Sequence, residues 1–129
     1  MAKFMREMFN GAMSSPKITE LHTFVDGEIL PVPGKPTALH MPGHTPGSAA
    51  FYLEQERILF SGDALTTKNP VLDKDMPPSV LPKGLSEDAP QAWRSLQKLH
   101  NLGHGLLLPG HGILWYGSIG TYVQRIQNQ

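Results

Sequence analysis

Residues 39–65 read LHMPGHTPGSAAFYLEQERILFSGDAL, and in this stretch apolar runs end in tight turns that carry a polar side chain. The turn PGH places His44 after one run, and SGD places Asp63 after another. Residues 106–111, LLLPGH, place His111 in the same way. Glycine before each polar residue lets the backbone turn sharply. The pattern predicts strand-end loops that bring these three side chains to one edge of a sheet.

The three side chains form a sensible ligand set for a metal ion. Two imidazoles and one carboxylate suit zinc or another borderline divalent cation. Pro42 and Pro46 stiffen the turn around His44, and metal ligands need such rigid support. Taken singly, each residue is a weak signal, because histidine has many other uses and Asp63 alone fits a turn or a cap. Only the joint pattern indicates a metal site.

Composition limits the class of protein. The 129 residues fit one domain, residues 1–129, and the formal net charge is zero, so we expect neither nucleic acid nor an anionic membrane as a partner. The chain has no cysteine, which excludes disulfides and thiolate ligands. No apolar run approaches the roughly 20 residues of a membrane span, and the N-terminus lacks the features of a signal peptide. We therefore expect a soluble, cytoplasmic protein.

The expected elements follow from periodicity and turn signals. Asp88 and Gln91 predict a helix start, and Gly103 predicts its end. The other expected elements are a helix at 2–13, a hairpin of 22–25 with 28–32 around Asp26-Gly27, strands at 37–41, 49–54, 57–60 and 106–108, a long loop at 66–85, and a last helix after Ser118. The strands at 49–54 and 57–60 are expected to be antiparallel. The order predicts an α/β (α+β) fold, a mainly antiparallel or mixed sheet with helices on one face.

Three motifs, LHMPGHTPGS, ILFSGDAL and LLLPGHG, resemble the later motifs of the metallo-β-lactamase-fold hydrolases. The resemblance implies half of a four-layer αββα sandwich, with two metal ions, often zinc, at its edge. It also implies that His44 binds the first metal, that Asp63 bridges both and is catalytic, and that His111 binds the second. In that family a metal-bound hydroxide attacks an ester, thioester, lactone or lactam carbonyl, or in some members a phosphodiester.

The chain departs from the family pattern in its ligand set. The family's HxHxDH motif is absent, and no HxH occurs anywhere. The resemblance therefore implies a truncated, C-terminal half that keeps three ligands and binds zinc or another divalent ion weakly or not at all. We expect the isolated chain to be weak or inactive unless another chain supplies ligands. The alternative is a catalytically silent folded domain or a self-associating binding module.

Other polar residues near the motifs have weaker signals. His100 and His104 have i, i+4 spacing, but the helix is expected to stop between them, so we interpret them as structural. His40 is expected in the sheet interior or in contact with a ligand. Ser61 and Thr45 either hydrogen-bond the ligands or satisfy turn backbone groups.

The expected sheet has two apolar faces, and the helices of this chain cover one of them. Phe51, Leu53 and Leu59 are expected on the other face, which would lie open. Open apolar faces of this kind mark association surfaces. We expect a homodimer through this face, or pairing with the family's missing N-terminal half.

Overall fold

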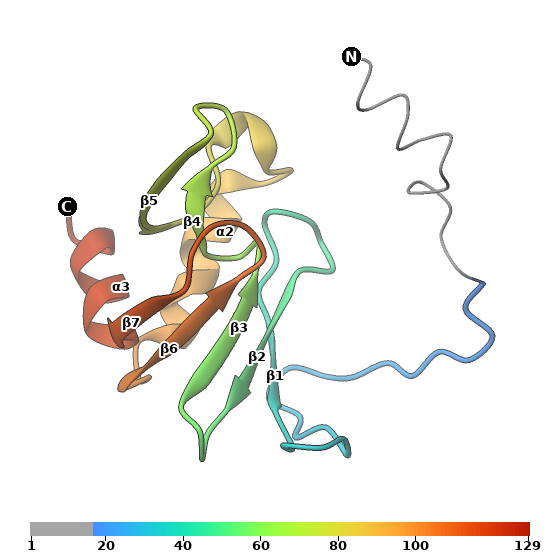
Figure 1. Ribbon diagram of the computed structural model, residues 1–129. Coiled ribbons are helices and arrows are strands. Elements are labelled where there is room, and N and C mark those ends of the chain that lie inside the picture. Colours follow the sequence, from blue (N-terminus) through green and yellow to red (C-terminus); the bar gives the residue numbers. More distant parts are fainter. Residues whose placement is uncertain (1–16) are drawn as a thin grey trace.

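The fold is built on a five-stranded sheet with the strand order β1-β2-β3-β6-β7 (Figure 1). The structure is a computed structural model that describes residues 17–129, so the helix expected at 2–13 lies outside the described residues. The strands are β1 (Thr37–His40), β2 (Ala49–Leu53), β3 (Ile58–Gly62), β6 (His104–Pro109) and β7 (Trp115–Ser118). β3 and β6 are parallel and the other neighbours antiparallel. The predicted mixed sheet is confirmed.

The direction of the strands explains why the same ending recurs three times. β1 and β3 are each antiparallel to β2, and β6 is parallel to β3, so β1, β3 and β6 all run the same way. Strands that run the same way end at the same edge of a sheet. The loops after these three strands carry His44, Asp63 and His111. The sequence pattern therefore becomes a cluster at one sheet edge.

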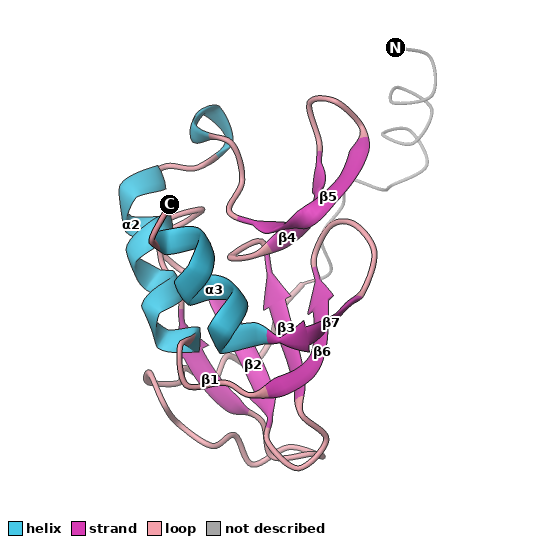
Figure 2. Ribbon diagram, turned by 90° about the vertical axis from the view of Figure 1, so that its left-hand side faces the viewer, coloured by secondary structure: helices cyan, strands magenta, loops and turns pink. Residues whose placement is uncertain are grey.

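The helices α2 (Ala89–Ser95) and α3 (Ile119–Gln127) lie on the same side of the sheet, as predicted (Figure 2). The Asp88 carboxylate caps α2 by accepting a 2.8 Å hydrogen bond from the Gln91 backbone N–H. The α-helix ends before Gly103, because the chain tightens into a 3-10 turn, η2 (Leu96–Leu99). A second 3-10 turn, η1 (Lys83–Leu85), precedes the helix.

A hydrophobic core fills the space between the helices and the sheet. Its fully buried members from the strands and helices include Leu59, Leu96, Leu99, Leu107 and Val123. Leu59 was expected on the uncovered face, and this expectation is wrong. Phe51 pairs with Phe60, which places the neighbouring Leu59 on the helical side of the sheet with no exposed surface.

The opposite face of the sheet carries large apolar side chains that no helix of the described chain covers. Alternation along the paired strands places there Phe51, Leu53, Ile58, Phe60, Leu106, Leu108 and Tyr116, which we call the open face. The expected positions of Phe51 and Leu53 are therefore confirmed. Phe60 is 42% exposed and Tyr116 70% exposed. At the β1 end, the Phe24 ring packs edge-on against Phe51, with the centroids 5.7 Å apart.

The expected hairpin around Asp26-Gly27 is only partly present. The turn exists, with Gly27 at φ +81° and the Glu28 N–H donating to the Val25 carbonyl at 3.1 Å. The flanking strands are absent from the described chain, where an isolated bridge from Ile29 to Thr37 takes their place. Residues 28–32 run into Pro31 and Pro33, which have no N–H to extend a ladder.

Residues 66–85 were expected to form a loop, and this is wrong. Residues 66–79 of this stretch form a two-stranded antiparallel sheet of β4 (Thr66–Asn69) and β5 (Lys74–Ser79), and η1 follows. The Asn69 side chain closes the connection by accepting hydrogen bonds from the N–H groups of Val71 and Leu72. The hairpin could not be recognised from the sequence, because β5 contains two adjacent prolines and neither strand alternates in polarity.

Strand β7 was not anticipated either. It has only four residues, and its Gly117 lies opposite Gly105 of β6. Strand signals come from longer alternating runs, so a short glycine-containing strand is recognised only from its pairing. No helix among residues 17–129 is long and apolar enough to cross a membrane.

Candidate metal centre

Asp63 lies between the two predicted histidine ligands. Its Oδ1 is 2.7 Å from His111 Nδ1, and its Oδ2 is 3.6 Å from His44 Nε2. The side chains of Asp63 and His44 are only about a quarter exposed, at 25% and 27%. Residues that are 19 and 48 positions from Asp63 in the sequence therefore share one site, with one carboxylate oxygen directed at each imidazole.

A backbone carbonyl fixes the orientation of the His44 ring. His44 Nδ1 is 2.8 Å from the Leu85 carbonyl oxygen. A carbonyl only accepts, so Nδ1 carries the proton and Nε2 keeps its lone pair. Metal-binding histidines are held in this way by a partner on the second ring nitrogen. The arrangement leaves the Nε2 atom of His44 free to bind a cation beside Asp63.

The His44 turn is fixed to the start of α2. Gly43 has φ +138°, and a Cβ there would collide with the backbone of Ala92. Its carbonyl accepts a 2.9 Å hydrogen bond from the Asp88 N–H, and the Ser95 hydroxyl donates to the Pro42 carbonyl at 2.7 Å. Glycine is required here because only glycine allows this close approach and positive φ together. The helix therefore positions the histidine.

The turns that carry Asp63 and His111 are also joined to each other. The Gly110 N–H donates to the Gly62 carbonyl at 2.8 Å. A Cβ on Gly110 would lie 2.6 Å from Asp63 Oδ1, so the glycine of the third ending leaves room for the carboxylate. The Thr67 N–H donates to the His111 carbonyl at 3.1 Å. Strand β4 thus supports the His111 turn from outside the main sheet.

The hydroxyl groups of Ser61 and Thr45 serve the turns. The buried Ser61 donates to the Leu65 carbonyl at 2.6 Å. Thr45 Oγ1 is 3.0 Å from Ser48 Oγ, which also accepts from the Thr45 N–H. Of the two interpretations from the sequence, the structure supports the satisfaction of turn groups.

The remaining histidines of interest lie outside the cluster. His100 Nε2 contacts the Gln127 side-chain oxygen at 2.6 Å, whereas His104 begins β6 and packs against the Tyr116 ring. The helical segment ends at Leu99 and His104 begins a strand, so the expectation that no helix aligns the two histidines is confirmed. His40 is exposed rather than in the sheet interior, and its Nε2–H donates to the Pro46 carbonyl at 2.8 Å. It stabilises the turn that carries His44.

The donor set suits a divalent ion in type but is incomplete in arrangement. In the part of the chain that the structure describes, no group of three His, Cys, Asp or Glu side chains converges as a ready metal site. The contacts instead join the residues in pairs, with Asp63 common to both pairs. Two imidazoles and a carboxylate remain chemically suitable ligands for zinc or iron.

Sequence reasoning missed the groups that hold these ligands in place. The Leu85 carbonyl comes from η1, Thr67 from β4 and Ser95 from the end of α2. A backbone carbonyl has no side-chain signature, so nothing in the sequence marks Leu85. Thr67 and Ser95 were not distinguishable because their partners lie 44 and 53 positions away.

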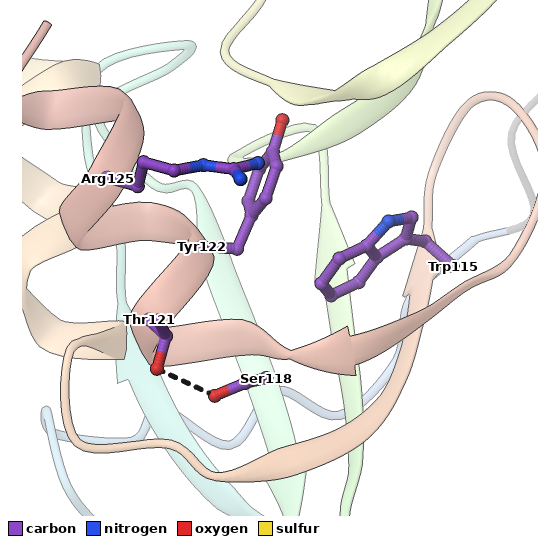
Figure 3. Close-up of a pocket in the computed structure, with 5 residues that line it drawn as sticks. All are labelled: Trp115, Ser118, Thr121, Tyr122 and Arg125. Carbon is purple, nitrogen blue, oxygen red and sulfur yellow. Dashed lines mark hydrogen bonds between the residues drawn. The ribbon is translucent and has the colours of Figure 1, made fainter.

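A separate hollow of about 230 Å³ lies beside α3 and β7 (Figure 3). Trp115 and Arg125 contact the ring of Tyr122, with Arg125 5.3 Å from its centroid. The Tyr122 hydroxyl donates to the Pro78 carbonyl at 2.8 Å, and partial burial raises the pKa of this hydroxyl. Tyr122 thus links α3 to the β4–β5 hairpin, and at the edge of the hollow the Ser118 hydroxyl donates to Thr121 Oγ1 at 2.9 Å.

The chain belongs to the metallo-beta-lactamase superfamily, whose family model matches residues 3–111. It is 30% identical over 108 residues to the atrochrysone carboxyl ACP thioesterase of Aspergillus fumigatus. Among solved structures it resembles the metallo-beta-lactamase family protein TTHA1429 from Thermus thermophilus, with 27% identity and a TM-score of 0.59. It also resembles the BLEG-1 B3 metallo-beta-lactamase, with 26% identity and a TM-score of 0.61, and TTHA1623 in a di-iron-bound form, with 29% identity and a TM-score of 0.54.

The matches cover most of this chain but less than half of each relative. The thioesterase alignment covers 81% of this chain and 28% of that protein. The alignments with TTHA1429, BLEG-1 and TTHA1623 cover 98%, 80% and 78% of this chain, and 44%, 46% and 46% of those chains. The family and the hydrolase-type fold are therefore shown.

Proposed function

We propose that this chain carries the His44–Asp63–His111 part of a metal-dependent hydrolase centre. The observation that supports the proposal is the position of Asp63, with one carboxylate oxygen directed at each histidine. The three residues come from three loops that meet at one sheet edge. Support from Leu85, Gly43 and Thr67 holds the loops in place, as a metal centre requires.

A divalent ion held by these residues, with zinc as our first choice, would supply Lewis acidity that polarises a substrate carbonyl. The side chains have separate roles in this proposal. His44 offers its Nε2 lone pair because Nδ1 is engaged by Leu85. Asp63 offers two oxygens, which allows it to neutralise charge and to connect two positions. His111 closes the site on the side of β6.

The substrate class that we propose is an acyl ester or thioester. The curated relative is a thioesterase, which favours a thioester over a lactone or a lactam for this chain. That protein is much longer than the matched region, so its own substrate is not transferred.

We further propose that the chain alone is weak or inactive as a hydrolase. Three protein ligands shared between two positions form a poor tetrahedral set, and solvent would fill the rest. The sequence has no HxH motif to complete the set. Full activity would then need ligands from outside residues 1–129. The 2.7 Å contact also supports a second candidate, a folded domain without catalysis, since Asp63 Oδ1 already pairs with His111 Nδ1.

The test is a zinc titration of metal-stripped protein by calorimetry, followed by assays with a thioester, a lactone and nitrocefin. We expect at most one weakly bound ion per chain and no turnover above the background from zinc alone. Asp63→Asn should abolish the binding that remains, because it removes the charge that both positions share. The matched control is Glu54→Gln, an exposed carboxylate in the turn at the other end of β3, which should bind as the parent does.

The outcomes separate the candidates. Weak binding that Asp63→Asn abolishes supports an incomplete metal centre. Binding that neither variant alters would favour the silent domain. Two tightly bound ions, or strong turnover lost in Asp63→Asn, would overturn the proposed weakness and establish the chain as an enzyme by itself.

A further inference from the structure

The open face is a feature of the described chain that the candidate metal centre does not use. Its side chains come from four adjacent strands, with Phe51, Phe60, Leu108 and Tyr116 from β2, β3, β6 and β7, respectively. Helices α2 and α3 both lie on the other side of the sheet (Figure 2). The uncovered side chains therefore form one surface rather than scattered exposed residues.

We infer that this face binds a second copy of the chain, sheet against sheet. No Asp, Glu, Lys or Arg occupies an open-face position on the five described strands, so a copy related by a two-fold axis meets no like charge. A face without charged groups has nothing that selects a charged partner, and an apolar surface is complementary to itself. The formal net charge of zero also removes long-range repulsion between copies.

Two exposed rings of the open face supply part of the area that a dimer interface needs. An aromatic side chain presents about 150–250 Å², so exposures of 42% for Phe60 and 70% for Tyr116 leave on the order of 200 Å² from two rings. A standard interface takes about 800 Å² from each partner. Two residues therefore supply about a quarter of that area.

Two further features belong to this surface: a hollow within it and an apolar extension at its edge. A hollow of about 270 Å³ lies on the face between Phe51, Phe60 and Leu108 and reaches Gly110 at the edge that carries Asp63. Beyond Phe51 the apolar surface continues through Phe24, which contacts it, to Leu21 and Val25, which are more than two-thirds exposed. When two identical faces pack together, the exposed rings of one copy can insert into the hollow of the other.

The experiment is sedimentation equilibrium of the full chain over a range of micromolar concentrations. We expect a monomer–dimer equilibrium. The double variant Phe60→Lys/Tyr116→Lys should raise the dimer dissociation constant at least about tenfold, because it places charges in an apolar interface. The matched control is Val71→Lys/Leu72→Lys, which alters exposed apolar residues in the β4–β5 hairpin and should leave the dimer intact. Far-UV circular dichroism of each variant checks that it is folded.

Cross-linking gives a second measurement that does not depend on the lysine variants. The chain has no cysteine, so a single cysteine can be introduced cleanly. Phe60 lies on β3, the central strand of the sheet, and so lies near the middle of the proposed interface. Phe60→Cys should form a covalent dimer on mild oxidation, whereas Val71→Cys should not. Three results would each overturn the inference: a monomer at all concentrations, a dimer that survives the open-face lysines, or equal cross-linking of both cysteine variants. A monomer at all concentrations would favour a different protein as the partner.

Discussion

The two faces of the central sheet are both apolar, but they differ in what covers them. On one face, Leu59 and Leu107 are fully buried beneath α2, η2 and α3. On the other face, the adjacent residue Phe60 is 42% exposed and Tyr116 70% exposed. Neighbouring residues of one strand thus have opposite environments, because successive side chains of a strand point to opposite faces.

The covered face and the open face have different roles, the first in the stability of one chain and the second in association. The free energy of unfolding of one chain depends on the covered face, where side chains leave water on folding. The open face contributes little to that free energy until another surface covers it. The candidate metal centre lies at the edge between the two faces. Its His44 turn is attached to the covered side, and its Gly110 turn borders the open side.

The largest expected effect compares two adjacent residues of β3. Leu59→Ala creates a cavity in the covered core and should lower the free energy of unfolding by about 2–5 kcal/mol. Phe60→Ala, on the open face, should change it by under about 1 kcal/mol when the protein is dilute. Urea denaturation of both variants measures the difference. Equal losses would show that the two faces do not differ as described.

A smaller effect is expected in the turn that joins the metal centre to α2. Gly43→Ala forces a side chain into the backbone of Ala92 at φ +138° and should destabilise the chain by about 1–3 kcal/mol, with weaker zinc binding. Gly47→Ala is the matched control in the same loop, because its Cβ would meet no atom within 4 Å. Thermal unfolding and a zinc titration test the pair. An unaffected Gly43→Ala would mean that the turn does not depend on the helix.

A smaller change at the contact between the His44 turn and α2 removes the hydrogen bond from Ser95 to Pro42. Ser95→Ala leaves the Pro42 carbonyl without its partner and should cost about 1 kcal/mol. Ser118→Ala, which removes a hydroxyl pair with Thr121 near the surface, should cost under about 0.5 kcal/mol. Chemical denaturation distinguishes the two serines. A reversed order would assign the support of the His44 turn to other contacts.

The smallest expected effect concerns an ion pair outside both faces. Lys98 donates to Asp26 at 2.6 Å and holds the pKa of Asp26 below its usual value. A carboxyl group with a lowered folded-state pKa stabilises the fold above its unfolded pKa, about 3.9, and this stability is lost as the pH falls through the folded-state pKa. Both side chains are more than a third exposed, so screening limits the effect to under about 1 kcal/mol.

Asp26→Asn should therefore lower the free energy of unfolding slightly at neutral pH and should leave it unchanged once both forms are at acid pH. The measurement is urea denaturation of parent and variant from neutral pH down to acid pH. If the difference in the free energy of unfolding between parent and variant grew toward acid pH, the pKa of Asp26 would not be lowered by folding.

The sequence by itself determined the main strands and indicated the candidate site residues. The endings PGH, SGD and PGH indicated His44, Asp63 and His111, because glycine turns after apolar runs are local signals. Alternation and capping residues placed β1, β2, β3, β6 and α2 for the same reason. The hairpin of β4 and β5 and the short strand β7 were missed, because prolines and glycine remove the local pattern on which strand recognition depends.

The tertiary structure decided what depends on register and distance. Pairing of Phe51 with Phe60 moved Leu59 from the open face to the core, since a shift of one residue exchanges the faces of a strand. The common direction of β1, β3 and β6 brought the three endings together, and the Leu85 carbonyl selected the free nitrogen of His44. These contacts join residues that are far apart in the chain, and no local pattern encodes them.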